Sequence, residues 1–263
     1  MTNSSQKSQA ASQSLAGKVC LVTGGTRGIG RAIAESLLAE GASVAICGRR
    51  QESVERAVEE LSSENARRAG TGKVTGKAAD VRNHADVGAL FQFVDQHFGG
   101  LDVLVNNAGV GVFRAIGEIA LEEWSSTIET NLSGVFYCSR EALFRFVTRG
   151  GGYIVNISSL AGSNAFAGGA AYNASKFGLN GLSEAMMQDV RSENVRVSTI
   201  MPGSVATGFS GRSDGGPGED SGSDWKVWPE DVAEIVRMLL KMPARTLVSR
   251  VEMRPSKPRK SGR

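Results

Sequence analysis

Short apolar runs alternate with amphipathic stretches along most of the chain. Runs of strand length occupy residues 18–23, 43–47, 73–80, 101–109, 151–159, 195–202 and, with an alternating pattern, 246–253. Several stretches between them carry apolar residues three and four positions apart, as helices do, notably residues 51–69, 121–148 and 172–192. Continuous apolar strands between helices predict a parallel sheet covered on both faces. We expect one doubly wound α/β domain over residues 16–253, with about seven strands in the order 3-2-1-4-5-6-7.

Three segments depart from this alternation. Residues 1–15 are polar, lack the apolar stretch of a signal peptide, and are expected to form a disordered leader. Residues 207–228 are rich in Gly, Ser and Asp and follow the sixth strand, at the edge where such sheets bind ligands. They predict a mobile substrate lid, with a passive loop as the alternative. Residues 254–263 form a basic tail.

Composition and charge exclude several classes of function. The tail carries five basic residues, more than the net charge of +3 of the whole chain, so the folded body is not basic and a nucleic-acid partner is not expected. The chain contains no run of about 18 apolar residues, so no membrane-spanning segment is predicted. The three cysteines are widely spaced, which favours buried thiols in a reducing cytoplasm over disulfides or a zinc site. The two histidines stand apart from any such cluster, so no metal is expected.

The segment TGGTRGIG, residues 23–30, follows the first strand and opens a helix. Its glycines permit a tight turn and a close approach of the backbone to a ligand. The helix N-terminus then offers free N–H groups and the positive end of the helix dipole to a pyrophosphate. In this strand–turn–helix context the segment predicts a Rossmann-type dinucleotide site.

The end of the second strand indicates which dinucleotide binds. Gly48 stands where an NAD-binding fold commonly places an acidic residue, and Arg49 and Arg50 follow it. Arg27 lies in the glycine loop. Guanidinium groups bind a 2′-phosphate that a carboxylate would repel, so NADP is the expected cofactor. Ordinary solvated arginines are the alternative interpretation.

Tyr172 and Lys176 lie four positions apart, which places both side chains on one face of a helix. This spacing alone is weak evidence, because one turn of an ordinary helix can supply it. The chain, however, carries seven motifs in order. They are TGGTRGIG, Asp80-Val81, NNAG at 106–109, ETNLSG around Asn131, NISS at 156–159, Tyr172-x-x-x-Lys176, and PGSVAT at 202–207.

In these motifs residues 16 to 242 resemble the short-chain dehydrogenase/reductase family, and within it the NADP-dependent carbonyl reductases that include 3-oxoacyl-[acyl-carrier-protein] reductases. The resemblance implies a catalytic tetrad of Asn131, Ser159, Tyr172 and Lys176, with the family's spacing selecting Ser159 over Ser158. It also implies cofactor contacts from Gly24, Gly25, Thr26, Arg27, Gly28, Ile29, Gly30, Arg49, Arg50, Asp80, Val81, Asn107, Ala108, Gly109, Tyr172, Lys176, Pro202, Gly203, Val205 and Thr207.

The expected chemistry is reduction of a ketone to a secondary alcohol. Lys176 would favour the phenolate of Tyr172, whose ordinary pKa is about 10, and Tyr172 would donate the proton. Ser159 would hydrogen-bond to the substrate oxygen, and Asn131 would hold a water between Lys176 and solvent. For Asn131, hydrogen bonding to the backbone is the competing explanation.

The substrate remains open at this point. Candidates are simple ketones, 3-oxoacyl thioesters, and sugars, polyols or diketones; a cofactor-binding regulator without turnover is a further alternative. The lid offers few apolar side chains, which does not indicate a snug steroid or long acyl pocket. Candidates for pocket walls are Phe113, Phe166, Phe209 and Trp225, with ordinary packing as the alternative. A homodimer or homotetramer is expected through the helices near 121–148 and 172–192.

Overall fold

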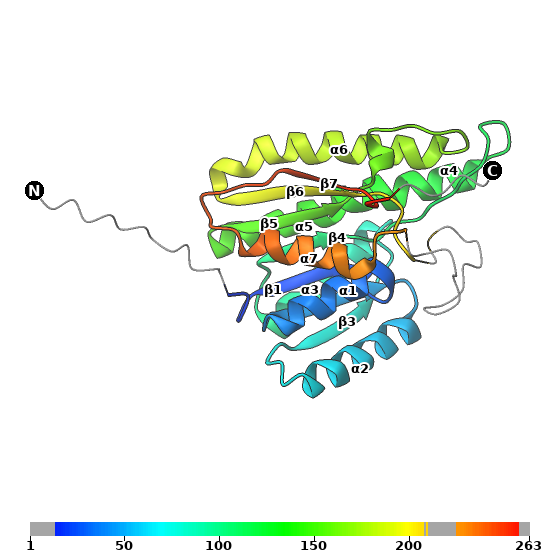
Figure 1. The fold of residues 1–263 in the computed structure, drawn as a ribbon. Coiled ribbons are helices and arrows are strands. Elements are labelled where there is room, and N and C mark those ends of the chain that lie inside the picture. Colours follow the sequence, from blue (N-terminus) through cyan, green and yellow to red (C-terminus); the bar gives the residue numbers. More distant parts are fainter. Residues whose placement is uncertain (1–13, 208, 210–224, 258–263) are drawn as a thin grey trace, which may run out of the picture.

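A single parallel sheet of seven strands lies between two layers of helices (Figure 1). The structure is a computed structural model that describes residues 14–207, 209 and 225–257. The strand order is β3-β2-β1-β4-β5-β6-β7, and every neighbouring pair is parallel. The predicted doubly wound α/β fold and its strand order are therefore confirmed.

The elements begin and end as follows. The strands are β1 Val19–Thr23, β2 Ser43–Gly48, β3 Val74–Ala78, β4 Val103–Asn106, β5 Gly152–Ile157, β6 Val195–Pro202 and β7 Arg250–Met253. The α-helices are α1 Gly28–Ala39, α2 Gln51–Arg67, α3 His84–Phe98, α4 Leu121–Ile128, α5 Gly134–Arg149, α6 Ala170–Val190 and α7 Pro229–Lys241. The short helices are η1 Glu129–Ser133, η2 Leu160–Gly162 and η3 Arg191–Glu193.

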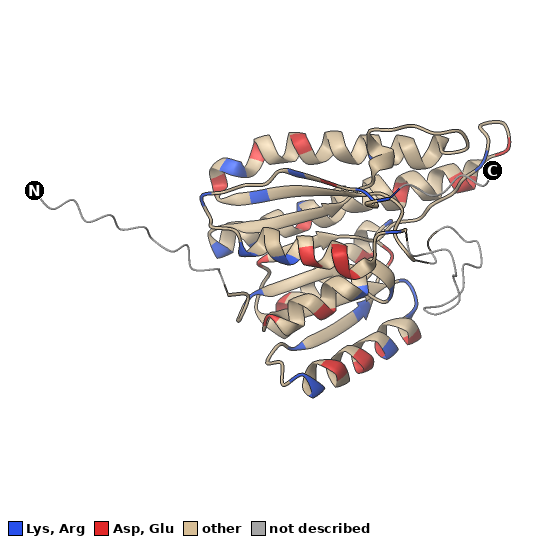
Figure 2. Cartoon of the chain, in the orientation of Figure 1, with Lys and Arg blue, Asp and Glu red and all other residues tan. Residues whose placement is uncertain are grey.

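The core is divided by the sheet into two apolar clusters. Along β1, Cys20 and Val22 pack with α1, α2 and α7, whereas Val19 and Leu21 pack with α3, α5 and α6. Successive side chains of a strand point to opposite faces, so a continuously apolar strand is buried on both. Figure 2 shows charged residues concentrated on the helices and loops, with the strands largely uncharged.

The predicted helix over 121–148 is interrupted in the structure. Residues Glu129–Ser133 form a π-helical segment between α4 and α5. The apolar period runs on through this segment, so the sequence pattern gave no sign of it. A π segment holds an extra residue per turn and is often found at functional sites. Here it contains Asn131.

Helix α7 was not predicted, although its sequence carries the usual start and stop signals. Pro229 occupies its first turn, and the Asp231 carboxylate accepts a hydrogen bond of 2.8 Å from the backbone N–H of Trp228. Lys241 lies in the last turn, where a cation suits the helix dipole. The helix packs on α1 and closes one face of the sheet.

The predicted leader and the predicted lid are only partly covered by the described residues. Leu15, assigned to the leader, is buried in the core, so the folded domain begins earlier than expected. Residues 1–13, and 208 and 210–224 within the predicted lid, lie outside the described residues. At the two ends of the lid, the Ala206 N–H donates to the Val227 carbonyl at 2.8 Å, which brings those ends together.

Candidate active site

The carboxyl ends of β1, β2, β4, β5 and β6 meet along one edge of the sheet, where a large cleft opens. Most of the predicted cofactor residues line it, and so do Ser159, Tyr172 and Lys176. Three predicted residues do not line it: Gly25, Gly30 and Asn131. Among the helices of the described residues, none is long and apolar enough to cross a bilayer.

The glycine loop after β1 requires glycine at two positions for its backbone angles. Gly24 has φ +64° and Gly28 has φ +56°, in the left-handed region that residues with a Cβ rarely adopt. A Cβ on Gly24 would lie 2.9 Å from the Cα of Ala108, so a side chain there would also collide with the loop after β4. The loop therefore approaches its neighbour closely and leaves its backbone open to the cleft.

Gly25 and Gly30 shape this loop from behind. A Cβ on Gly25 would stand 2.7 Å from Cγ2 of Ile46 in β2. A Cβ on Gly30 would collide with the carbonyl of Gly24 and the side-chain amide of Asn107. These two glycines permit the close packing of the glycine loop and α1 against their neighbours, and they do not line the cleft.

The N-terminus of α1 is open. Arg27, its N-cap residue, makes no side-chain cap, and the first turn holds no acidic residue. By contrast, the Asn83 side chain caps α3 by accepting from the Ala85 N–H at 2.8 Å. Uncapped N–H groups at the positive end of a helix suit an anionic group such as a pyrophosphate. The donor set at this end of the cleft therefore fits a dinucleotide.

Three exposed arginines surround the outer end of the cleft. Arg27, Arg49 and Arg50 all line it, and within residues 14–207, 209 and 225–257 none of them forms an ion pair. A Cβ added to Gly48 would lie 2.8 Å from Cγ2 of Thr26. The threonine methyl thus occupies the space in which an acidic side chain at position 48 would begin.

Asp80 carries a carboxylate that is already paired. Arg82 contacts it at 2.6 Å and, with a smaller contribution from Arg49, holds the pKa of Asp80 below its ordinary value. The neighbouring Val81 is buried, and a Cβ on Gly134 would touch it. Asp80 and Val81 thus form a fixed wall of the cleft beside the arginines.

The loop after β4 is tied to the glycine loop by Thr23, a residue that the sequence reasoning missed. Its buried hydroxyl accepts from the backbone N–H groups of Asn107 and Ala108, both at 3.0 Å. The Asn107 side chain in turn donates to the carbonyls of Thr23 at 2.9 Å and Gly24 at 3.1 Å. Thr23 is the first residue of the TGGTRGIG segment, but the glycine pattern by itself did not point to its hydroxyl.

Tyr172 and Lys176 lie in the first two turns of α6, and both are buried. The Lys176 Nζ atom is 5.8 Å from the centre of the Tyr172 ring and donates to the carbonyl of Ile157 at 2.9 Å. The hydrogen bond joins α6 to the end of β5. Burial lowers the pKa of Lys176 to about 8, because removal from water disfavours the ammonium form.

The expectation that Lys176 lowers the pKa of Tyr172 is not met in this structure. Burial raises the pKa of Tyr172, and the opposing contribution comes from a hydrogen bond with Ser159. Desolvation dominates because the phenol lies almost wholly out of water. Tyr172 is therefore protonated at neutral pH, the state that a proton donor needs.

The structure distinguishes the two serines of NISS. Ser158 is buried, and its hydroxyl donates to Oδ1 of Asn180 at 2.6 Å. Ser159 is partly exposed in the cleft, where its Oγ accepts from the Ala161 N–H at 3.1 Å and lies 3.5 Å from the carbonyl oxygen of Pro202. Ser159, the predicted member, is thus the one available to a substrate.

Asn131 lies behind the cleft in the π segment, fully buried. Its Nδ2 donates to the carbonyl of Val110 at 2.8 Å and to Oγ of Ser175 at 3.0 Å. Its Oδ1 accepts from the Val110 N–H at 2.8 Å. Both amide hydrogens are thus engaged, and Asn131 holds the loop after β4 against α6. The backbone-bonding explanation accounts for these contacts.

The remaining predicted contacts come from the loops after β4 and β6. Gly203 is packed tightly, since a Cβ there would lie 3.1 Å from Cδ1 of Leu160 and from Cδ of Pro255. Its N–H donates to the carbonyl of Met253 at 2.8 Å, which fixes the loop against β7. Other predicted contacts that line the cleft, from α1, the loop after β4, and the end of β6 with the loop that follows it, are Ile29, Ala108, Gly109, Pro202, Val205 and Thr207.

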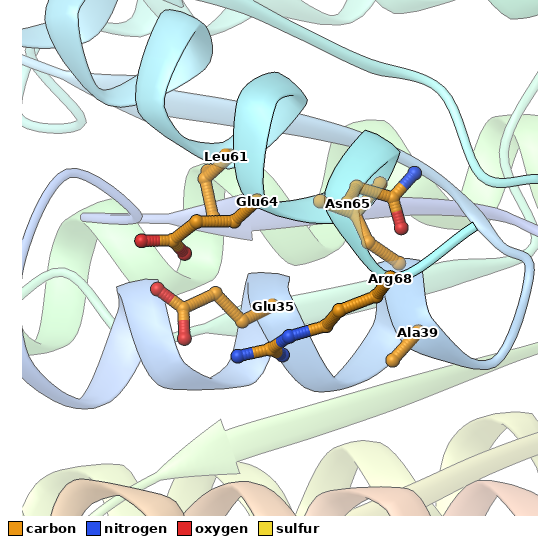
Figure 3. Close-up of a pocket in the computed structure, with 7 residues that line it drawn as sticks. Glu35, Ala39, Leu61, Glu64, Asn65 and Arg68 are labelled. Atoms are coloured by element: carbon orange, nitrogen blue, oxygen red, sulfur yellow. The ribbon is translucent and has the colours of Figure 1, made fainter. Parts of the chain in front are cut away.

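A second, small hollow lies between α1 and α2 (Figure 3). The carboxylates of Glu35 and Glu64 point toward one another there, and burial together with Glu64 raises the pKa of Glu35. The free volume is about 10 Å³, room for about one water molecule.

In the described part of the chain no group of three or more His, Cys, Asp or Glu side chains could hold a metal ion, and all three cysteines are free and buried.

The buried ammonium of Lys176 makes a prediction about stability. Between pH 8 and 10 the Lys176 side chain is still mostly protonated in the unfolded chain, whereas in the folded protein it loses its proton. The free energy of unfolding of the wild type should therefore rise by about 2–3 kcal/mol relative to Lys176→Met across this window. Urea unfolding of both proteins at pH 6, 7, 8, 9 and 10 measures the difference. The difference in free energy of unfolding between the two proteins should be constant below pH 7. A difference that stays constant up to pH 10 contradicts a lowered pKa of Lys176 in the folded protein.

Comparison with known proteins agrees with this geometry. The family model described as short chain dehydrogenase matches residues 18–215. A 3alpha-hydroxysteroid dehydrogenase of Mediterraneibacter gnavus is 36% identical over 193 residues, covering 73% of this chain and 76% of the relative.

Two solved structures share the fold. The crystal structure of a metagenomic short-chain oxidoreductase in complex with NADP has a TM-score of 0.78 and 33% identity, covering 94% of this chain and 100% of its own. The structure of an alcohol dehydrogenase from the archaeon Thermococcus sibiricus, complexed with 5-hydroxy-NADP, has a TM-score of 0.82 and 30% identity, covering 93% and 99%. On these matches and the geometry of the cleft, the chain belongs to the short-chain dehydrogenase/reductase family.

Proposed function

We propose that this protein reduces a ketone to a secondary alcohol with NADPH, with Tyr172 as the proton donor. The observation that carries the proposal is the composition of one cleft. An open helix N-terminus and three arginines form one end, and the Tyr172 phenol and Ser159 hydroxyl stand at the other. The relatives named for hydroxysteroid and alcohol dehydrogenation support the same class of reaction.

Two observations support NADP as the cofactor. Both structural neighbours were solved with NADP or a derivative of it. In this chain Gly48 is covered by Thr26, and Arg27, Arg49 and Arg50, which form no ion pair among the described residues, line the cleft and could bind a 2′-phosphate. When bound, the reduced nicotinamide supplies a hydride, with its electron pair, to the carbonyl carbon.

The residues of the chain supply the remaining chemistry. The protonated Tyr172 donates its proton to the developing alkoxide, and Ser159 donates a hydrogen bond to the same oxygen. Lys176, fixed to the Ile157 carbonyl, places a cation near the phenol as it becomes a phenolate. Asn131 acts as a positioning residue that holds Ser175 and the backbone of Val110. We also propose a water molecule that connects Lys176 to solvent and provides a path for protons.

Cofactor preference should depend on Arg49. A charge-assisted hydrogen bond contributes about 1.5–3 kcal/mol, so Arg49→Ala should weaken NADPH binding by roughly 10- to 100-fold and leave NADH binding nearly unchanged. Fluorescence titration with both nucleotides measures the dissociation constants. Arg67→Ala, at an exposed arginine in the last turn of α2 and outside the cleft, is the control and should change neither. Equal affinities of the wild type for NADPH and NADH contradict the proposal.

Loss of the phenolic hydroxyl should abolish most turnover. Tyr172→Phe should lower kcat by at least about two decades, because general acid catalysis contributes that much, while NADPH affinity and the melting temperature stay close to wild type. Oxidation of NADPH at 340 nm and a thermal melt give both readouts. Tyr137→Phe, in a partly exposed tyrosine of α5, is the matched control. A Tyr172→Phe enzyme with near-full turnover removes Tyr172 from the catalytic role.

Two alternatives are distinguished by the same assay. Sugars, polyols or diketones could occupy the cleft in place of simple ketones or 3-oxoacyl thioesters. A regulator that binds NADP without turnover would show tight binding and no oxidation of NADPH with any carbonyl compound. The presence of all four tetrad residues, with Ser159 and Tyr172 both in the cleft, favours the enzyme.

A homodimer or homotetramer is also proposed, together with a reducing cytoplasm in which the buried thiols stay free. Phe136, Phe144 and Val147 on α5 and Phe177 on α6 are large apolar side chains exposed to solvent. Helices with such faces commonly pack against a partner. Light scattering after size exclusion should give a multiple of 27.7 kDa for the wild type and a smaller species for Phe144→Asp. A monomeric wild type contradicts this proposal.

A further inference from the structure

Three phenylalanine rings surround the catalytic end of the cleft. The ring of Phe113 lies 5.4 Å from that of Tyr172, edge to face, and the ring of Phe209 lies 5.8 Å from it. Phe166 extends the wall, 5.9 Å from Phe113. The spacings are those of favourable aromatic contacts, so the rings form one connected wall beside the proton donor.

Glycines allow these rings to come so close. A Cβ on Gly111 would lie 2.6 Å from Cε1 of Phe209 and 3.0 Å from Cζ of Phe113. A Cβ on Gly169 would lie 2.7 Å from Cε2 of Phe166. Two rings therefore rest over one glycine and the third over another, which leaves no room for a side chain beneath them.

The loops that carry Phe113 and Phe166 are fixed to one another. An isolated parallel bridge pairs Arg114 with Gly169. On the Phe166 side, the backbone N–H of Phe166 donates to Oδ1 of Asn173 at 3.3 Å, and Nδ2 of Asn173 donates to the Ala161 carbonyl at 2.6 Å. The backbone beside Phe113 and that of Phe166 are thus held in place.

The rings are packed on one side and open on the other. Phe113, Phe166 and Phe209 are 41%, 47% and 40% exposed, high values for phenylalanine, and all three line the cleft. Exposed apolar rings gathered beside a reacting group indicate contact with an apolar ligand. Two cations bordering the cleft are already neutralised, Arg114 by Glu123 at 2.9 Å and Arg254 by Glu252 at 3.2 Å.

We infer that the substrate is a ketone attached to, or part of, a compact apolar ring, which packs against Phe113, Phe166 and Phe209 while its oxygen faces Tyr172 and Ser159. The inference rests on the proposed function. In the reaction the carbonyl carbon gains a hydride from NADPH and the oxygen gains the proton of Tyr172. The products are a secondary alcohol and NADP⁺, and solvent returns a proton to Tyr172.

A panel of four ketones tests the substrate class at 340 nm with saturating NADPH. The probes are acetophenone, butan-2-one, erythrulose as a ketose, and the acetoacetyl thioester of N-acetylcysteamine. We expect kcat/KM for acetophenone to exceed that for each of the others by at least about tenfold. A higher kcat/KM for the ketose or the thioester overturns the inference while the proposed function stands. If none of the four oxidises NADPH, the proposed function itself fails.

The variant Phe166→Ala tests the wall directly. It should lower kcat/KM for acetophenone by about 10- to 100-fold, mainly through KM, and change that for butan-2-one by less than about threefold. Affinity for NADPH and the melting temperature should stay at wild-type values. Phe93→Ala is the matched control, because Phe93 is a partly exposed ring of α3 that packs on His97, outside the cleft. Equal losses for both ketones, or no loss for acetophenone, contradict the role of the rings.

Discussion

Parallel pairing of all the strands is the constraint on which the site depends. Because every strand points the same way, the ends of β1, β4, β5 and β6 meet at one edge. Side chains that are far apart in the sequence, such as those of Thr26, Tyr172 and Thr207, are thereby brought together at this edge. Individual hydrogen bonds then fix the loops: the Asn107 N–H of the loop after β4 donates to the Thr23 hydroxyl, and Lys176 donates to the Ile157 carbonyl at the end of β5.

Burial has opposite effects on the two members of the Tyr172 and Lys176 pair. It raises the pKa of the phenol and lowers that of the ammonium, so at neutral pH both still hold their protons. For the proposed reaction this means a proton donor that already holds its proton before the substrate binds, with a cation close to the proposed phenolate. The energetic cost of burying Lys176 is partly offset by the hydrogen bond to Ile157.

Much of this arrangement could be predicted from sequence, because apolar period and motif order depend on local rules. The strand order and the position of the glycine loop between β1 and α1 are examples. The choice of Ser159 over Ser158 rested on the family's spacing and stays a prediction. The π segment around Asn131 could not be predicted, since the apolar period continues through it and the contacts of that amide with Val110 are tertiary. The sequence likewise named Phe113, Phe166 and Phe209 only as candidates, because the wall depends on Gly111 and Gly169 beneath the rings.

In the proposed reaction a hydride is transferred to a ketone in this cleft, and Tyr172 supplies the proton. NADPH deuterated at the transferable C4 position, incubated with acetophenone and the enzyme, tests it most directly. The account predicts that deuterium appears on the carbinol carbon of the alcohol, as seen by NMR, and that its yield matches the NADP⁺ formed. Tight NADPH binding with no deuterium in any alcohol product across the ketone panel would contradict it.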